Sequence, residues 1–470
     1  MSISKQESVS RWVLSRDDAQ VVSANQTHSS MLARGPVRAR AAVTLEQVLS
    51  TKSAAETPLE RAAEGLVGAD RRLLFELVLG SLRWLRRLDS VLGMAAGRPL
   101  EKIEPRIRAP LRIAAYQLLF LDRVPSYAIV DEAVRDVRRR GRDRATGFAN
   151  AVLRRIGKDR SLAAWPVEAE TEIERLGLET SHPDFLVRRW MNRFGASVVA
   201  DLLAANNQPK PIHLLCLGDR AVIAAELGEH GVETTMDVLS PHGLRVQSGD
   251  PMSTRAFHDG RVYVQDDASQ AAALVPPPSA GETILDAAAS PGGKGFALRV
   301  AEPSVRLIAA DLSIRRLQRL RANEERLGIR VPMLVGNARV PPLAEVFDRV
   351  VLDLPCSGTG TMARRPELKW RLSEKEIDRL AAQGAAILES TSGLVLPGGL
   401  LCVITCSVEA EENELVVGQF LERTESFEAM PLEDRLPESM SSGLEAEGRW
   451  RLLPTADHDG FTVHVMRRRR

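Results

Sequence analysis

The sequence has few cysteines, no long apolar run and almost no net charge. Four cysteines in 470 residues cannot form a disulfide framework for so long a chain, so we expect reduced thiols, a cytoplasmic location and no metal site. No apolar run approaches the roughly 20 residues that a membrane-spanning helix needs, which excludes a helical membrane protein. Residues 1–30 are polar and lack the apolar core of a secretion signal, so we interpret them as a disordered leader.

The net charge of +1 conceals an uneven distribution of charge. Residues 31–160 contain 26 Lys and Arg against 15 Asp and Glu, an excess of 11 positive charges that the rest of the chain nearly cancels. A basic segment joined to an acidic one indicates that the first segment binds a polyanion. Arg-rich helices that are merely solvated would give the same composition, so the charge alone does not decide.

Helical periodicity dominates residues 31–160. Apolar residues there recur at three- and four-residue intervals, most clearly in 71–92 and 108–121, which predicts an all-α bundle. Residues 161–275 mix helical stretches with short β-like runs, which predicts a connector followed by a small α/β subdomain. The β-like runs are 213–216, 243–246 and 261–264.

After the three prolines at 276–278 the pattern changes to alternating strands and helices. Short apolar runs separated mostly by helical stretches predict a Rossmann-like, largely parallel sheet over residues 276–470, so the fold class is α/β. The predicted strands are 283–287, 306–310, 331–335, 349–352 and 400–404. A last apolar run at 461–466 would lie antiparallel on one edge of the sheet.

A glycine-rich turn follows the first predicted strand of this sheet. The turn extends from Asp286 to Lys294 and leads into a helix, whose N-terminal amides can approach a ligand. Asp311 ends the second predicted strand, where a carboxylate can accept hydrogen bonds from ribose hydroxyls. A dinucleotide would fit this spacing, but the G-x-G-x-x-G fingerprint is missing.

Two cysteines follow neighbouring predicted strands. Asp353 and Cys356 come at the end of the fourth strand, and Cys406 comes at the end of the fifth. Ligands of an open parallel sheet bind outside these strand ends, so both thiols could face one pocket. A lone buried cysteine is more often a packing residue than a nucleophile, which is our interpretation of Cys402.

These blocks together resemble the Nol/Nop/Sun family of RNA 5-methylcytosine methyltransferases, and within it the branch that modifies bacterial 16S rRNA. The resemblance begins near residue 31 and rests on Asp353-Leu354-Pro355-Cys356-Ser357 followed by Thr405-Cys406-Ser407. Residues 126–133 and 147–155 resemble helices of the NusB-like RNA-binding domain of this branch. The resemblance implies S-adenosylmethionine as cofactor and RNA, 16S rRNA first of all, as partner; we expect a monomer.

The resemblance also implies roles for individual residues. Cys406 would attack carbon 6 of cytosine, which makes carbon 5 a nucleophile, and Cys356 would assist proton removal or release of the adduct. Asp353 would face both the cofactor and the base; Asp311 would bind the ribose and Asn337 would lie near the adenine. The methionine part of the cofactor would contact Ala288, Ala289, Ser290, Pro291, Gly292, Gly293 and Lys294. Chemistry alone leaves the two cysteines interchangeable.

Four positions depart from the usual pattern of the family. Ala288, Ser290 and Gly295 replace a Cys, an Ala and a Thr of the glycine turn. These changes exchange small residues for small residues beside a contact made by the backbone, so we expect cofactor binding to survive. Asn337 replaces an Asp, and its side-chain carbonyl can still accept a hydrogen bond from the adenine amine.

Cationic residues near these blocks are candidates for phosphate contacts. Those that follow the first cysteine block are Arg364, Arg365 and Lys369. Those of a denser patch in the helical part are Arg138, Arg139 and Arg140. We interpret Trp370 as a packing residue rather than a base-stacking one, and residues 467–470 as a disordered tail.

The sequence leaves three alternatives open. The same chemistry could act on transfer RNA or another RNA. The fold could also serve a non-catalytic RNA-binding assembly factor, although both cysteines, Asp353 and Lys294 argue against that. A DNA cytosine methyltransferase would carry its nucleophile in the Pro-Cys block and would lack the downstream Thr-Cys-Ser.

Overall fold

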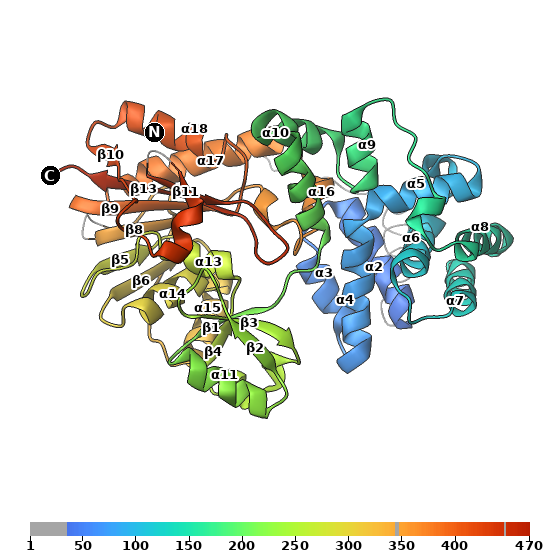
Figure 1. The fold of residues 1–470 in the computed structure, drawn as a ribbon, viewed down its shortest axis with the longest axis horizontal. Helices are drawn as coiled ribbons and strands as arrows, with labels where there is room; N and C mark the ends of the chain where they lie inside the picture. The colour runs from blue at the N-terminus through green and yellow to red at the C-terminus, as the bar shows by residue number, and fades with distance from the viewer. Residues whose placement is uncertain (1–34, 344–346, 446–447) are drawn as a thin grey trace, which may run out of the picture. The chain divides into compact units, whose positions relative to one another are not determined.

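The computed structural model describes residues 35–343, 347–445 and 448–470 (Figure 1). The leader predicted over residues 1–30 lies outside the described residues. The chain separates into two compact units, with the division between Asp184 and Phe185, and the boundaries predicted at 160 and 275 stay predictions. Within the described ranges, every helix is too short or too polar to cross a bilayer.

The first unit is entirely helical in its described residues, which confirms the predicted all-α part. Its α-helices are α2 (Val37–Thr51), α3 (Glu56–Ala63), α4 (Gly68–Arg83), α5 (Leu85–Ala96), α6 (Pro105–Phe120), α7 (Ser126–Arg139), α8 (Thr146–Lys158) and α9 (Glu172–Glu179). The stretch 71–92, predicted to be helical, forms two helices, because the backbone leaves the helical path at Trp84. Gly97 then ends α5 in the left-handed conformation that glycine adopts without strain.

Arg140, one of the predicted RNA contacts, lies beside a proline inside α6. Pro110 has no N–H, so the carbonyl of Arg106 loses its helical hydrogen bond. The Arg140 guanidinium donates to that carbonyl at 3.3 Å and pairs with Asp136 and Glu46. The Arg140 side chain is only 5% exposed, so the prediction that it binds RNA is wrong: the guanidinium is used inside the helical unit.

Gly80 allows α4 to pack closely on α6. A Cβ atom at position 80 would lie 2.1 Å from Cζ of Tyr116. The Tyr116 ring is buried and stacked on Phe120, with ring centroids 5.3 Å apart, and its hydroxyl donates to Glu76 of α4. The ring therefore has no room to move away from a larger residue.

We predict that Gly80→Ala lowers the melting temperature of the full-length protein, because overpacking of a close-packed core costs about 1–3 kcal/mol. Gly147→Ala in α8 is the matched control, since nothing lies within 4 Å of a Cβ at that position. Alanine is the better helix former, so the control should melt at the same temperature or slightly higher. Equal melting temperatures for the two variants in calorimetry would contradict the packing described for Gly80.

The second unit begins in α10 (Asp184–Asn207), whose helical path breaks at Gly195, and continues into a small antiparallel sheet. The strands in the order β2-β3-β1-β4 are β2 (Glu233–Met236), β3 (Gly243–Ser248), β1 (His213–Cys216) and β4 (Val262–Val264). The accompanying helices are α11 (Arg220–Glu229) and α12 (Arg255–His258). This confirms the predicted small subdomain, although β2, which is mostly exposed and lacks an apolar alternation, was not predicted.

A nine-stranded sheet forms the rest of the unit, in the order β11-β12-β13-β9-β8-β5-β6-β7, with β10 paired to β13. Its strands are β5 (Thr283–Asp286), β6 (Arg306–Asp311), β7 (Met333–Val335), β8 (Phe347–Asp353), β9 (Val395–Thr405), β10 (Phe427–Ala429), β11 (Leu444–Glu445), β12 (Arg449–Leu452) and β13 (Phe461–Arg468). The strands from β5 to β9 in this sheet run parallel, as predicted for a Rossmann-like fold.

The end of the chain differs from its prediction in two respects. β13 pairs antiparallel with β9, as expected, but it is not an edge strand because β12 and β10 pair with it as well. The tail predicted from residue 467 is wrong, since β13 continues to Arg468, whose guanidinium donates to the Val395 carbonyl at 2.5 Å. Strand pairing therefore orders these arginines.

Helices cover both faces of the large sheet. They are α13 (Asp267–Ala273), α14 (Gly293–Ala301), α15 (Ile314–Leu327), α17 (Glu374–Ser392) and α18 (Glu414–Arg423), and a short helix, α16 (Leu368–Arg371), precedes α17. Side chains alternate along each strand, so Val351 and Cys402 pack toward α14 and α15, whereas Val350 and Leu401 pack toward α17 and α18. Cys402 is buried in this core, and burial raises the pKa of its thiol to about 11.

Candidate active site

The predicted site residues lie where the parallel strands end. In the pairing of β8 with β9, Asp353 lies opposite Ile404, and the backbone N–H of Leu354 donates to the Ile404 carbonyl at 2.9 Å. The loops that follow the two strands therefore start side by side. Cys356 lies in the first of these loops and Cys406 in the second.

The structure brings the two cysteines together, with 3.5 Å between their sulfur atoms. The backbone around them is tightly packed: the N–H of Gly360 donates to the Cys406 carbonyl at 2.9 Å, and the N–H of Gly460 donates to the Gly360 carbonyl at 2.8 Å. A Cβ atom at Gly360 would lie 2.3 Å from the Gly460 oxygen. Only glycine permits this approach, which fixes the Cys406 loop against the Cys356 loop.

The two thiols are electrostatically unequal. The hydrogen bond from the Cys356 thiol lowers the pKa of Cys406, and the positive charges of Lys294 and Arg365 lower it further. Burial and the Asp353 carboxylate act in the opposite direction. The same hydrogen bond, together with burial, raises the pKa of Cys356 well above its ordinary value. The arrangement favours a thiolate at Cys406 and a thiol at Cys356, and a thiolate is the nucleophilic form.

A half-buried ion pair lies beside the cysteines. Lys294 Nζ is 2.6 Å from Asp353 Oδ2 and 5.6 Å from the centroid of the Phe461 ring. Burial alone would lower the Lys294 pKa, but the Asp353 carboxylate outweighs it and the pKa is raised. Asp286 is fully buried nearby, and burial raises its pKa to about 7. Sequence reasoning assigned no role to Asp286 or Phe461; an acid at the end of a buried strand was the available signal for the first.

A cavity of about 190 Å³ lies over the glycine turn. The residues that line it are Tyr263, Val264, Gln265, Ser269, Asp286, Ala288, Ala289, Ser290, Pro291, Gly293, Lys294 and Asp353. A Cβ atom at Gly293 would lie 3.1 Å from the Gln265 amide, so the backbone of the turn is in close contact with its neighbour. The carboxylates of Asp286 and Asp353 and the Lys294 ammonium suit a zwitterion with an added positive charge, which fits the methionine part of S-adenosylmethionine.

The two other predicted cofactor contacts are Asp311 and Asn337. Only Asp311 borders this turn. Asp311 is 2% exposed, and its Oδ2 atom accepts from the N–H of Ser290 at 3.4 Å, so it borders the turn directly. Asn337 lies beyond β7 and lines a separate, smaller depression beside Ala287 and Ala310. Its Oδ1 atom accepts from the N–H of Arg339 at 3.0 Å, which leaves one lone pair for an adenine amine.

Two of the predicted RNA contacts after the first cysteine block are structural residues. Lys369 is completely buried, with its ammonium 2.7 Å from Oδ1 of Asn207. The Arg364 guanidinium pairs with Asp266 at 2.7 Å and with Asp459 at 2.9 Å. The prediction is wrong for Lys369, because a buried ammonium cannot reach a phosphate, and Arg364 is already held by two carboxylates.

The remaining predicted RNA contacts are accessible. The side chain of Arg365 is 48% exposed, and its charge reaches Cys406, where it helps to lower the pKa of the thiol. In the helical unit, Arg138 is exposed and Arg139 is about one third exposed, with Asp143 and Asp136 as their respective partners. Trp370 is half-buried, in keeping with a packing role.

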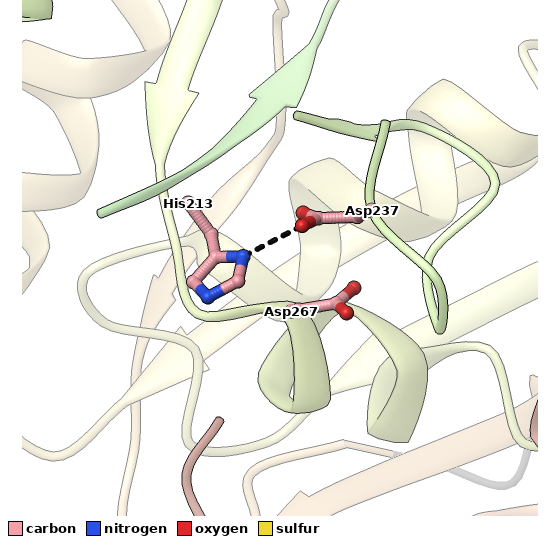
Figure 2. A group of neighbouring side chains, drawn as sticks. All are labelled: His213, Asp237 and Asp267. Carbon is pink, nitrogen blue, oxygen red and sulfur yellow. Dashed lines mark hydrogen bonds and ion pairs between the residues drawn. The ribbon is translucent and has the colours of Figure 1, made fainter. Parts of the chain in front are cut away.

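One cluster among the described residues has the composition of a metal site: His213, Asp237 and Asp267 (Figure 2). Both ring nitrogens of His213 already face acceptors, with Nδ1 2.7 Å from Asp237 Oδ1 and Nε2 3.0 Å from the carbonyl oxygen of Asp457. An imidazole that donates from both nitrogens has no lone pair left for a metal. We interpret the cluster as a buried imidazolium held by the Asp237 carboxylate and the Asp457 carbonyl. Burial lowers the His213 pKa, but the hydrogen bond and charge of Asp237 outweigh it and the pKa is raised.

This interpretation predicts a pH-dependent effect of His213→Asn on stability. A histidine with a raised pKa stabilises the fold fully below its unfolded pKa of about 6.5, and this contribution is lost as the pH rises through the folded pKa. The melting temperature should therefore fall more at pH 6 than at pH 8.5. A chelator should leave the wild-type melting temperature unchanged; a larger defect at pH 8.5 or a chelator-sensitive melting temperature would contradict the ion pair.

Comparison with known protein families matches residues 273–467 to the family described as 16S rRNA methyltransferase RsmB/F, and residues 36–158 to the NusB family. The chain is 31% identical over 411 residues to the probable ribosomal RNA small subunit methyltransferase B of Bacillus subtilis (strain 168), which covers 85% of this chain and 91% of the relative. The chain belongs to the RsmB/F family of 16S rRNA methyltransferases. This membership confirms the resemblance found in the sequence, and the helical unit contains the family's NusB domain.

Further proteins are similar to this chain. The ribosomal RNA small subunit methyltransferase B of Vibrio cholerae is 33% identical over 395 residues, which cover 83% of this chain and 89% of that protein. The crystal structure of PH0851 matches 92% of this chain and 98% of its own, with a TM-score of 0.75 and 27% identity. NSun6 from Pyrococcus horikoshii matches 60% of this chain and 97% of its own with a TM-score of 0.53 and 20% identity, which shows the fold alone.

Proposed function

We propose that the protein transfers a methyl group from S-adenosylmethionine to carbon 5 of a cytosine in 16S rRNA, through a bond between Cys406 and carbon 6 of the base. The observation that carries the proposal is the pair of sulfur atoms 3.5 Å apart, beside the Lys294–Asp353 ion pair and the glycine-turn cavity. Membership of the RsmB/F family supports 16S rRNA as the substrate.

In the first step the Cys406 thiolate adds to carbon 6, and the electron pair of the ring double bond moves toward carbon 5 and the ring nitrogen. Asp353 offers an acceptor to the exocyclic amine, while the Lys294 ammonium lies 2.6 Å from Asp353 and stabilises the negative charge that develops. When bound, S-adenosylmethionine supplies the electrophilic methyl group that carbon 5 then takes up.

In the second step Cys356 removes the carbon 5 proton. The hydrogen bond to Cys406 is the largest cause of the raised Cys356 pKa, followed by burial. Formation of the adduct converts Cys406 into a neutral thioether, so this cause disappears and Cys356 can release its own proton to solvent. The Cys356 thiolate then takes the carbon 5 proton, and the electrons of the C–H bond expel the Cys406 sulfur from carbon 6.

The RNA must present its cytosine outside the base stack, because a thiol cannot reach carbon 6 within a helix. Arg365 is exposed and its charge acts on Cys406, and we propose that it binds a phosphate near the target base. We further propose that Arg138 and Arg139 of the NusB domain contact other phosphates of the RNA, and that the reaction takes place in the cytoplasm.

We predict opposite results for the two cysteines. With RNA and labelled S-adenosylmethionine, Cys406→Ala should abolish methyl transfer because no nucleophile remains. Cys356→Ala should accumulate a covalent protein–RNA adduct, visible as a band of reduced mobility in denaturing gels. Cys402→Ala, a change at a buried cysteine on β9, is the control and should retain transfer. Methyl transfer by Cys406→Ala would exclude the mechanism.

The substrate can be tested by bisulfite sequencing of RNA from cells that lack the gene. We predict that one or more 16S rRNA cytosines lose their methyl group and regain it when the wild-type gene, but not Cys406→Ala, is returned. Loss of a transfer RNA methyl group instead would support the alternative substrate. An unchanged pattern in all RNA would support the non-catalytic factor, and methylation of duplex DNA but not RNA would refute the proposal.

A further inference from the structure

A buried glutamate connects the two cysteine loops. Glu412 lies between β9 and α18 and is 3% exposed. Its Oε1 atom accepts from the backbone N–H of Ser357 at 2.7 Å, and its Oε2 atom accepts from the Ser357 hydroxyl at 2.6 Å. Ser357 directly follows Cys356, so Glu412 holds the Cys356 loop through both the backbone and the side chain of one residue.

The same hydrogen bonds continue to the other cysteine loop. The hydroxyl oxygens of Ser357 and Ser407 are 3.2 Å apart, and Ser407 directly follows Cys406. Ser357 gives its proton to Glu412, so its oxygen is free to accept the Ser407 proton. The oxygen of Ser407 in turn accepts from the backbone N–H of Glu409 at 3.0 Å and faces the hydroxyl of Thr359 at 3.2 Å. The chain of donors therefore runs from Ser407 through Ser357 and ends at Glu412.

The segment that carries Glu412 is itself fixed. Asn413 accepts from the Thr405 hydroxyl at 2.6 Å and donates to the carbonyls of Ser407 and Glu409 at 3.1 and 2.8 Å. The Glu409 carboxylate accepts from the Trp190 indole at 2.8 Å, which ties the segment to α10. A side chain at position 412 thus has a rigid base from which to hold Ser357.

We propose that Glu412 is a positioning residue for the reaction: its carboxylate holds the Ser357 loop against the Ser407 loop and thereby sets the separation of the Cys356 and Cys406 sulfur atoms. This inference rests on the proposed function only for its catalytic consequence. The proposal assigns Glu412 no contact with RNA or cofactor. Its effect on the reaction passes through the thiol–thiolate hydrogen bond, which needs the two sulfurs within about 4 Å of each other.

Glu412 could act on the cysteines through the length of its side chain or through its charge. We propose that the length is what matters. Burial raises the Glu412 pKa to about 7, although the hydrogen bonds from the hydroxyl and the N–H of Ser357 oppose this. Its charge also helps to raise the Cys356 pKa, after the larger effects of the Cys406 hydrogen bond and burial. The groups that face Cys406 are Cys356, Asp353, Lys294 and Arg365, and none of them changes in the variants below.

Two single substitutions at position 412 separate the effect of side-chain length from the effect of charge. Glu412→Asp keeps the charge but is one methylene shorter, so it cannot hold Ser357 in the same place. Glu412→Gln keeps the length and can accept from the Ser357 N–H through its oxygen, with its NH₂ group donating to the hydroxyl and the hydroxyl chain reversed. A positioning role therefore predicts that Glu412→Asp makes the Cys406 thiol less reactive, whereas Glu412→Gln leaves its reactivity close to that of the wild type.

The experiment measures the alkylation rate of Cys406 by iodoacetamide in the full-length protein as a function of pH, with mass spectrometry of the Cys406 peptide. We expect Glu412→Asp to raise the apparent pKa of Cys406 and to slow alkylation at pH 7 by about tenfold, the change in thiolate fraction for one pKa unit. Glu412→Gln should stay within about twofold of wild type. Glu411→Gln, a neighbour that pairs with Arg189 instead, is the matched control and should be unchanged.

Each other outcome overturns the proposal. If Cys406 of Glu412→Asp is alkylated with the pH profile of the wild type, the length of the side chain does not matter. If alkylation slows equally in both variants, the effect is due to charge. If Glu412→Asp does not fold, Ser357→Ala replaces it, because this change removes the bridge to Ser407 while leaving the backbone bond to Glu412; an unchanged profile would then refute positioning. The assay needs no RNA or cofactor, so failure of the proposed function would appear separately, as methyl transfer by Cys406→Ala.

Discussion

The parallel pairing of β8 with β9 is the constraint on which the candidate site depends. Because Asp353 lies opposite Ile404, the chain leaves both strands at the same edge, and residues 50 positions apart in the sequence begin their loops side by side. Gly360 allows the Cys356 loop to approach the backbone of Cys406 more closely than any residue with a Cβ atom would. The separation of the two sulfur atoms is thus a property of the sheet and its loops rather than of the cysteines themselves.

Burial then determines the chemistry of the groups at this edge. Two thiols in water would each have an ordinary pKa, but here one hydrogen bond in a place of low solvent access lowers the pKa of Cys406 and raises that of Cys356. Lys294 keeps its charge in the same surroundings because Asp353 is 2.6 Å away. The difference in pKa favours Cys406 as the nucleophile and Cys356 as its partner. The order of the sequence blocks implies the same assignment.

The sequence predicted the sheet and the clustering of the site well, because both depend on short-range signals. Apolar runs located β5, β6, β8 and β9, and the rule for strand ends placed Cys356 beside Cys406. Roles that depend on tertiary burial were not predictable. Lys369 and Arg140 read as exposed cations in the sequence, yet one is completely buried and the other satisfies a carbonyl freed by a proline elsewhere in the chain.

Glu412 is a residue whose role the sequence did not indicate at all. Glu412 is one of four glutamates between positions 409 and 414, and nothing in the sequence indicates that its carboxylate receives two hydrogen bonds from Ser357, a residue 55 positions earlier. Likewise β2 and the short strands β10 to β12 have too few apolar residues to be recognised without their partners. In each case the missing information was the neighbour that only the folded chain supplies.

The central claim is that Cys406, and not Cys356, bonds to carbon 6 of the base. RNA in which the target cytosine is replaced by 5-fluorocytosine tests it most directly, because the carbon 5 fluorine cannot leave as a proton does and the adduct persists in the wild-type enzyme. After incubation with S-adenosylmethionine, digestion and mass spectrometry should find the nucleotide on the peptide that contains Cys406. The nucleotide on the peptide that contains Cys356 would contradict the account.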